Sequence, residues 1–120
     1  MLNLKSVMIG SSNPKELAKF YEMLIGKPAE YAEDDWFGWH LDGLSLNIGF
    51  HSEVESGAKD PKRLILNFET SDVKAEFERL KTGGAIVIAK PYEMEEGNGG
   101  WIATMADIDG NYFQLMSPWE

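Results

Sequence analysis

The sequence repeats one order of segments twice, and this repeat constrains the fold more than any other feature. The first half predicts a strand over Leu4–Ile9, a helix over residues 14–25, and strands over Trp36–Leu41 and Leu44–Phe50. The second half predicts a strand over Leu64–Phe68, a helix from Ser71-Asp72 to Gly83-Gly84, and strands over Ala85–Ala89, Ile102–Ala106 and Tyr112–Met116. We therefore expect two half-modules, at about residues 1–55 and 62–120, in one domain over residues 1–120.

Local signals set the boundaries of these segments. Asn13 followed by Pro14 is typical of a helix start, and Gly26 is typical of a helix end. Asp42-Gly43 between two apolar runs predicts a tight hairpin, and we expect a second two-residue turn at Asp109-Gly110. The polar segment over residues 51–62 is interpreted as a linker, and residues 91–100 as an acidic, Gly-rich loop.

A fold with strands and one helix in each half belongs to the α+β class. One helix covers only one face of a sheet, so the other face must form a cleft or pack against another element. We therefore expect the functional residues on the sheet faces that the helices leave free.

Charge and composition exclude several functions. The formal net charge is -9, which disfavours nucleic acid and anionic membrane surfaces as partners. There is no Cys, which excludes disulfides, thiolate nucleophiles and Cys-type zinc sites. Residues 1–10 hold no apolar run of the length that a signal peptide needs, and no stretch approaches roughly 20 apolar residues. We therefore expect a cytoplasmic protein that does not span a membrane.

Four stretches together resemble the vicinal oxygen chelate superfamily, which includes glyoxalase I, extradiol dioxygenases, and bleomycin and fosfomycin resistance proteins. They are Ser6–Ile9, Pro14–Gly26, Leu66–Val73, and Asp107–Leu115, whose DIDGN start looks like the family's Asp-Pro-Asp-Gly-Asn ending. The resemblance implies two tandem βαβββ modules that form a curved mixed sheet around a cleft, with the helices on the outer face. It also implies a homodimer.

Metal-dependent members of that superfamily hold a divalent ion through His, Gln and Glu side chains, two from each half. The matching positions here carry Ser6, Asn47, Ile65 and Gln114. Ile65 has no donor atom, and the other three lack the imidazole, carboxylate or thiolate groups that divalent transition metals prefer. We therefore expect no metal and no other cofactor, and we lean toward a protein that is not an enzyme.

Strand alternation predicts which side chains line the cleft. Leu44, Leu46, Ile48 and Phe50 form the apolar, helix-facing set of their strand. The expected ligand-binding residues on the cleft side are Trp36, His40, Asn47, Glu69, Trp101, Met105, Tyr112 and Gln114. No catalytic residue is identified.

Several of these residues have a second interpretation. Trp36 and Trp101 either stack on a flat or cationic ligand or pack at a dimer interface. His40 is either a general base or a hydrogen-bonded strand residue, and Glu69 either faces the cleft or lies at an exposed strand end. The acidic loop from Glu93 to Gly100 is either a lid that offers carboxylates or a solvated loop.

Three functions remain open. The first is metal-independent binding, or sequestration, of a small molecule, cationic or aromatic, in an aromatic and acidic cleft. The second is a metal-dependent lyase or dioxygenase with an altered metal site. The third is a protein-interaction or regulatory domain without enzymatic activity.

Overall fold

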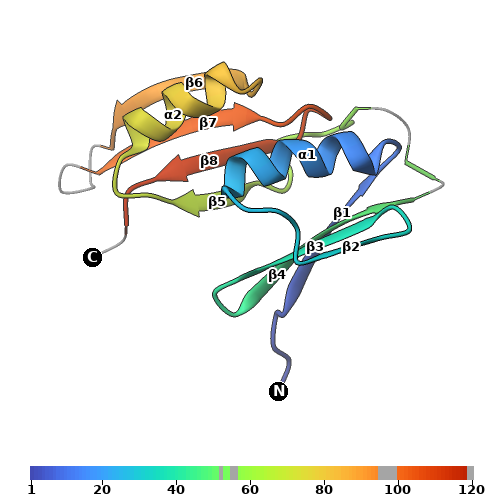
Figure 1. The fold of residues 1–120 in the computed structure, drawn as a ribbon. Coiled ribbons are helices and arrows are strands. Elements are labelled where there is room, and N and C mark those ends of the chain that lie inside the picture. The colour runs from blue at the N-terminus through green and yellow to red at the C-terminus, as the bar shows by residue number, and fades with distance from the viewer. Residues whose placement is uncertain (52, 55–56, 95–99, 119–120) are drawn as a thin grey trace. The chain divides into compact units, whose positions relative to one another are not determined.

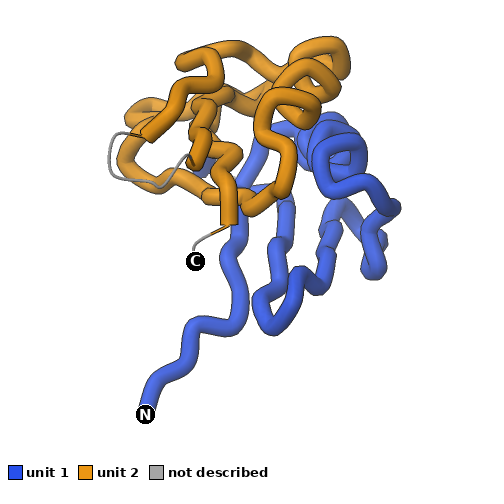
Figure 2. The backbone as a smooth tube through the Cα atoms, turned by 90° about the vertical axis from the view of Figure 1, so that its left-hand side faces the viewer, with its two compact units in different colours: residues 1–56 blue, residues 57–120 orange. Residues whose placement is uncertain are grey.

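A computed structural model describes residues 1–51, 53–54, 57–94 and 100–118. Its chain divides into two compact units, residues 1–56 and 57–120, which we call the first module and the second module (Figure 2). Each module is described by itself.

In its described residues the first module has one helix and four strands, which Figure 1 labels. They are β1 (Ser6–Ser11), α1 (Pro14–Ile25), β2 (Tyr31–Glu33), β3 (Trp36–Leu41) and β4 (Leu44–Phe50). The sheet order is β1-β4-β3-β2, with β1 parallel to β4 and the other pairs antiparallel.

The second module repeats this order of elements. They are β5 (Leu66–Glu69), α2 (Val73–Thr82), β6 (Ile86–Glu93), β7 (Trp101–Ala106) and β8 (Tyr112–Met116). The sheet order is β5-β8-β7-β6, again with one parallel pair, β5 with β8. The α+β class and the two tandem βαβββ modules are therefore confirmed, while the cleft stays a prediction, since it depends on how the modules are arranged.

The α1 helix begins and ends where the sequence predicts. Pro14 occupies the first turn, and Gly26 ends the helix with φ of 90°, a left-handed conformation that glycine adopts without strain. The apolar side of α1 is buried, and the indole N–H of the buried Trp39 on β3 donates to the Lys27 carbonyl just beyond the helix (3.0 Å). This bond places Trp39, and with it one face of the sheet, on the helix side.

The α2 helix is fixed by a cap and by packing on its own sheet (Figure 1). The Asp72 carboxylate accepts from the Ala75 backbone N–H (3.0 Å), as its position before the helix predicts. Val73, Phe77 and Leu80 are buried, and Phe68 meets Phe113 edge-to-face at 6.0 Å on the sheet.

Some boundaries differ from the prediction. The short strand β2 was not predicted, because its three residues show little alternation. Strand β6 continues through Pro91 to Glu93, where a loop was expected; Pro91 is tolerated at a sheet edge, where a missing N–H breaks no ladder bond. No helix in the described parts of the chain is long and apolar enough to cross a membrane.

The predicted linker is partly fixed to the second module. The Ala58 backbone N–H donates to the Asp109 carbonyl (2.9 Å), and the Pro61 carbonyl accepts from the Tyr112 N–H (3.3 Å). Residues 58–61 therefore pack beside the loop that joins β7 to β8.

The prediction of a two-residue turn at Asp109-Gly110 is wrong. A longer loop over residues 107–111 joins β7 to β8, and the buried Asp107 carboxylate organises it. The carboxylate accepts from the backbone N–H groups of Asp109 (2.9 Å) and Asn111 (3.0 Å) and from the Asn111 side-chain amide. The strand register is therefore shifted by one residue from the prediction, which moves each β7 side chain to the opposite face.

Replacing Asp107→Asn should destabilise the protein by about 2–3 kcal/mol. An amide has one acceptor oxygen where the carboxylate has two, and its NH₂ group would face a donor that the second oxygen now accepts from. Urea unfolding followed by circular dichroism measures this loss. Asp60→Asn, on an exposed residue of the same module, removes the same charge and should change stability by less than about 0.5 kcal/mol. Equal stability of the two variants would contradict the role of Asp107.

Candidate functional site

In each module one sheet face carries the helix, and we call the opposite face the open face. In the first module the pairing of β3 with β4 matches the prediction, with His40 opposite Ser45, Gly38 opposite Asn47 and Trp36 opposite Gly49. Cross-strand partners share a face, and Trp39 marks the helix side. Trp36, His40 and Asn47 therefore lie on the open face, as predicted.

Two glycines let larger side chains lie flat on this open face. A Cβ at Gly49 would overlap the six-membered ring of Trp36, so the indole rests directly on the backbone of β4. A Cβ at Gly38 would lie 2.7 Å from the Asn47 amide oxygen, so Asn47 leans back over β3. An aromatic ring and a carboxamide therefore lie side by side on the sheet.

His40 is held at the edge of this patch. Its backbone N–H donates to the Glu30 carboxylate (2.6 Å), which lowers the pKa of Glu30, and the Lys27 ammonium 3.6 Å away lowers it further. A hydrogen bond joins the His40 Nδ1 and Ser45 Oγ atoms (3.2 Å). This geometry matches the interpretation of His40 as a hydrogen-bonded strand residue.

The open face of the second module carries polar side chains on β8 and β5. Gln114 pairs with Thr104, and its amide donates to the Thr104 hydroxyl (3.2 Å). Tyr112 shares that face two residues earlier, and Glu69 is exposed at the end of β5. The predicted side of the sheet is confirmed for these residues, and their ligand contact stays a prediction.

Trp101 and Met105 were predicted on the wrong face. Met105 pairs with Phe113 and is fully buried on the helix side. The Lys74 ammonium of α2 lies 3.8 Å from the centre of the Trp101 ring, which places that ring on the helix side too. The one-residue register shift caused by Asp107 explains both errors, and neither residue faces the open side of its sheet.

The positions that hold a metal in metal-dependent members do not fit one here. Ser6 and Asn47 lie on the first module's open face and Gln114 on the second's, while Ile65, just before β5, has no donor atom. Hydroxyl and amide oxygens are weak ligands for divalent transition metals. Among the described residues no group of three or more His, Cys, Asp or Glu side chains is placed to hold a metal.

Three residues on the open face of the first module were not predicted from the sequence, and the acidic loop was predicted only in part. Tyr31 pairs with Gly38, Met8 pairs with Asn47, and Glu33 pairs with Trp36. Tyr31 and Glu33 were missed with strand β2, whereas the alternation of Ser6 and Met8 in β1 was a usable signal. Glu93 ends β6, and residues 95–99 of the predicted acidic loop lie outside the described residues.

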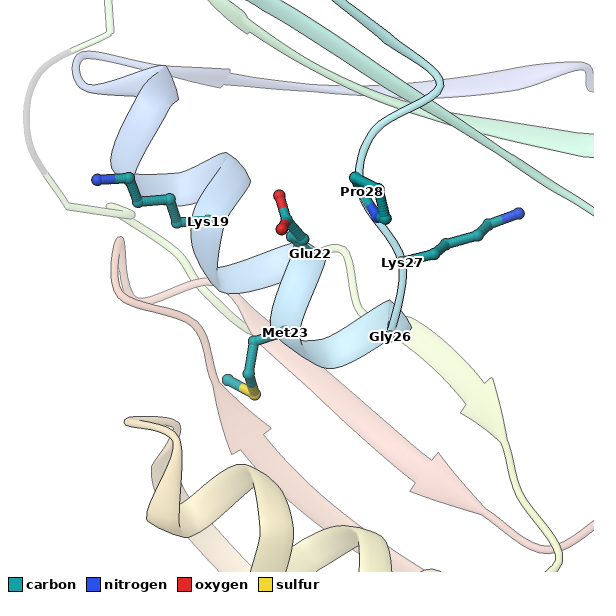
Figure 3. Close-up of a pocket in the computed structure, with 6 residues that line it drawn as sticks. All are labelled: Lys19, Glu22, Met23, Gly26, Lys27 and Pro28. Carbon is teal, nitrogen blue, oxygen red and sulfur yellow. The ribbon is translucent and has the colours of Figure 1, made fainter.

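A surface pocket of about 330 Å³ lies at the C-terminal end of α1 (Figure 3). Its lining residues are Lys19, Glu22, Met23, Gly26, Lys27 and Pro28. The two lysine ammonium groups point away from each other in Figure 3, and each already lies near a carboxylate, at 3.5 Å from Glu16 and 3.6 Å from Glu30. The polar groups of this pocket therefore do not converge on one ligand.

Gly49→Ala should destabilise the protein by about 1–3 kcal/mol, because the added methyl group forces the Trp36 ring off the sheet. The same substitution in a Trp36→Leu background removes that collision and should cost less. Urea unfolding of the four proteins gives the coupling between the two positions. Equal costs in both backgrounds would show that Trp36 does not rest on Gly49.

Comparisons with known proteins agree with this fold. A chain from Mycolicibacterium smegmatis, described as an uncharacterized protein, is 26% identical over 115 residues, which cover 96% of this chain and 93% of that one. A glyoxalase-related enzyme from Fulvimarina pelagi superposes with a TM-score of 0.81 at 17% identity, covering 98% of this chain and 89% of that one. A glyoxalase/bleomycin resistance protein/dioxygenase family enzyme from Burkholderia phytofirmans gives 0.79 at 18% identity, covering 97% and 98%.

These structural similarities show the fold alone, because identity is low. The family model of the glyoxalase-like domain, in contrast, matches residues 6–116, which include both modules from β1 to β8. The chain therefore belongs to the glyoxalase-like domain family, within the vicinal oxygen chelate superfamily.

Proposed function

We propose that this protein binds and sequesters a small organic molecule without a divalent metal, in the manner of a metal-independent, bleomycin-resistance-like member of its superfamily. The observation that carries this proposal is the chemistry of the open faces. They present an aromatic ring and amides at or beside the positions where metal-dependent relatives have metal ligands. Aromatic surface with a few orienting polar groups is typical of a small-molecule site.

The residues that we propose contact the ligand lie on the open faces of the two sheets. They are Trp36, His40 and Asn47 in the first module, and Glu69, Tyr112 and Gln114 in the second. The indole of Trp36 supplies stacking area, while Asn47 and Gln114 supply amides that orient polar groups. The net charge of -9 favours a cationic ligand over an anionic one.

Two further points stay predictions from the sequence. We propose a homodimer, which sedimentation equilibrium tests directly, and a monomer at micromolar concentration would contradict it. We also propose a cytoplasmic location, and its test is fractionation of the organism's cells.

Metal titration separates this proposal from a metal-dependent lyase or dioxygenase. Protein treated with a chelator should show no stoichiometric binding of Zn²⁺, Ni²⁺, Mn²⁺ or Fe²⁺ by calorimetry, because the superfamily positions lack suitable donors. Uptake of one equivalent of any of these ions with micromolar or better affinity would contradict the proposal.

A positive control for this titration can be built on the first module. Ser6 pairs with Ser45, and Ser45 pairs with His40, so the three residues form one row across the open face. The double variant S6H/S45H places three imidazoles in that row and should bind Zn²⁺ in the same assay.

Sequestration predicts that the ligand stabilises the protein and is released unchanged. A panel of small molecules screened by thermal unfolding should contain compounds that raise Tm, and at 100 times Kd the gain in stability is about 2.7 kcal/mol. Mass spectrometry of the recovered ligand should show the starting compound. Conversion to a product would show that the protein is an enzyme.

A further inference from the structure

The open face of the first module is organised in rows that cross the sheet. Strand pairing places Tyr31, Gly38, Asn47 and Met8 in one row, from β2 through β3 and β4 to β1. The next row holds Glu33, Trp36, Gly49 and Gly10. Among the described residues, these two adjacent rows contain the Tyr and Trp side chains of this face.

In the middle of both rows, glycines leave room for a neighbouring side chain to lie on the backbone. Trp36 rests on Gly49, and Asn47 leans over Gly38, so neither side chain stands upright from the sheet. The two lie across adjacent strands in opposite directions, because Trp36 comes from β3 and Asn47 from β4. The centre of the face is therefore a flat patch made of an indole and a carboxamide.

Larger side chains stand at both ends of the first row. Tyr31 on β2 is 51% exposed and Met8 on β1 is 44% exposed, so both side chains are accessible at the ends of this row. The strands that carry them are separated by three strand spacings, which is about 14 Å. This width accommodates a fused aromatic ring system that lies on the patch with Tyr31 and Met8 at its edges.

The polar groups around the patch favour a ligand with a positive charge. Glu33 is exposed and is the cross-strand partner of Trp36, so its carboxylate belongs to the same face. The Asn47 amide is the hydrogen-bonding group beside the ring. An aromatic ring with an adjacent carboxylate attracts a flat cation through stacking and charge together.

We propose that the first module's open face binds a planar aromatic cation, namely a fused ring system that carries an amino group or a protonated ring nitrogen. The ring stacks on Trp36 between Tyr31 and Met8, Asn47 bonds the ligand's edge, and Glu33 selects positive charge. This assignment rests on the proposed small-molecule binding and adds to it the class of ligand and the face that holds it.

The test uses proflavine, a planar aromatic cation, titrated into the metal-free full-length protein by calorimetry. We expect saturable binding that Trp36→Leu weakens by about tenfold or more, the size of effect that stacking on an aromatic side chain supports. Asn47→Ala should weaken it less, and Glu33→Gln should weaken it severalfold and reduce its dependence on salt. Tetraethylammonium, which is not planar, and 2-anthracenesulfonate, which is planar and anionic, should each bind at least tenfold more weakly than proflavine.

The matched control is Trp101→Leu, which removes an indole from the helix side of the second module's sheet. It should leave proflavine affinity unchanged, and far-UV circular dichroism confirms that both Trp variants are folded. Equal losses in the two Trp variants, or equal binding of the anionic probe, would overturn the assignment.

The outcomes also separate this inference from the proposed function. If other compounds from the panel bind without metal while proflavine does not, the ligand class is wrong. If Trp36→Leu leaves proflavine binding unchanged, the assigned face is wrong. In both cases the proposed function stands. If no compound binds at all, both are contradicted.

Discussion

In the parts of the chain that the structure describes, each four-stranded sheet has one helix, and the rest of the structure depends on this constraint. Each module has two sheet faces and one helix, so strand alternation divides its side chains into a set packed on the helix and a set on the open face. Trp39, bonded to the end of α1, and Trp101, covered by Lys74 of α2, mark the helix sides. Every functional proposal follows from which residues fall on the other side.

The chemistry of the open faces separates this chain from the metal-dependent members of its superfamily. The fold and the family are shared, but the ligand positions carry a hydroxyl, two amides and an isoleucine instead of imidazoles and carboxylates. In the first module Gly38 and Gly49 allow Asn47 and Trp36 to lie flat. A surface of this kind favours stacking and hydrogen bonding over Lewis-acid chemistry.

The sequence predicted part of the first module's open face correctly, and it misplaced two residues of the second module for a specific physical reason. Asp42 and Gly43 both have positive φ, 51° and 87°, as a two-residue hairpin turn requires, so Trp36, His40 and Asn47 were placed correctly. Asp109-Gly110 has a similar pattern, but the buried Asp107 draws the loop into a longer form. The hydrogen bonds that Asp107 makes inside this loop leave no periodic pattern in the sequence. The loop length was therefore predicted wrongly, and Met105 and Trp101 were placed on the wrong face. Strand β2 was missed because its three residues show little alternation and because its turn, in which Asp34 and Asp35 have positive φ, has no glycine.

Two-dimensional NMR of the metal-free protein tests the central claim most directly, since it reports the contact surface and metal independence together. On addition of proflavine, the account predicts saturable shifts of the Trp36 indole N–H and the Asn47 side-chain amide, with the Trp101 indole N–H unchanged. Shifts confined to the second module's helix side, or shifts that appear only after a divalent metal is added, would contradict it.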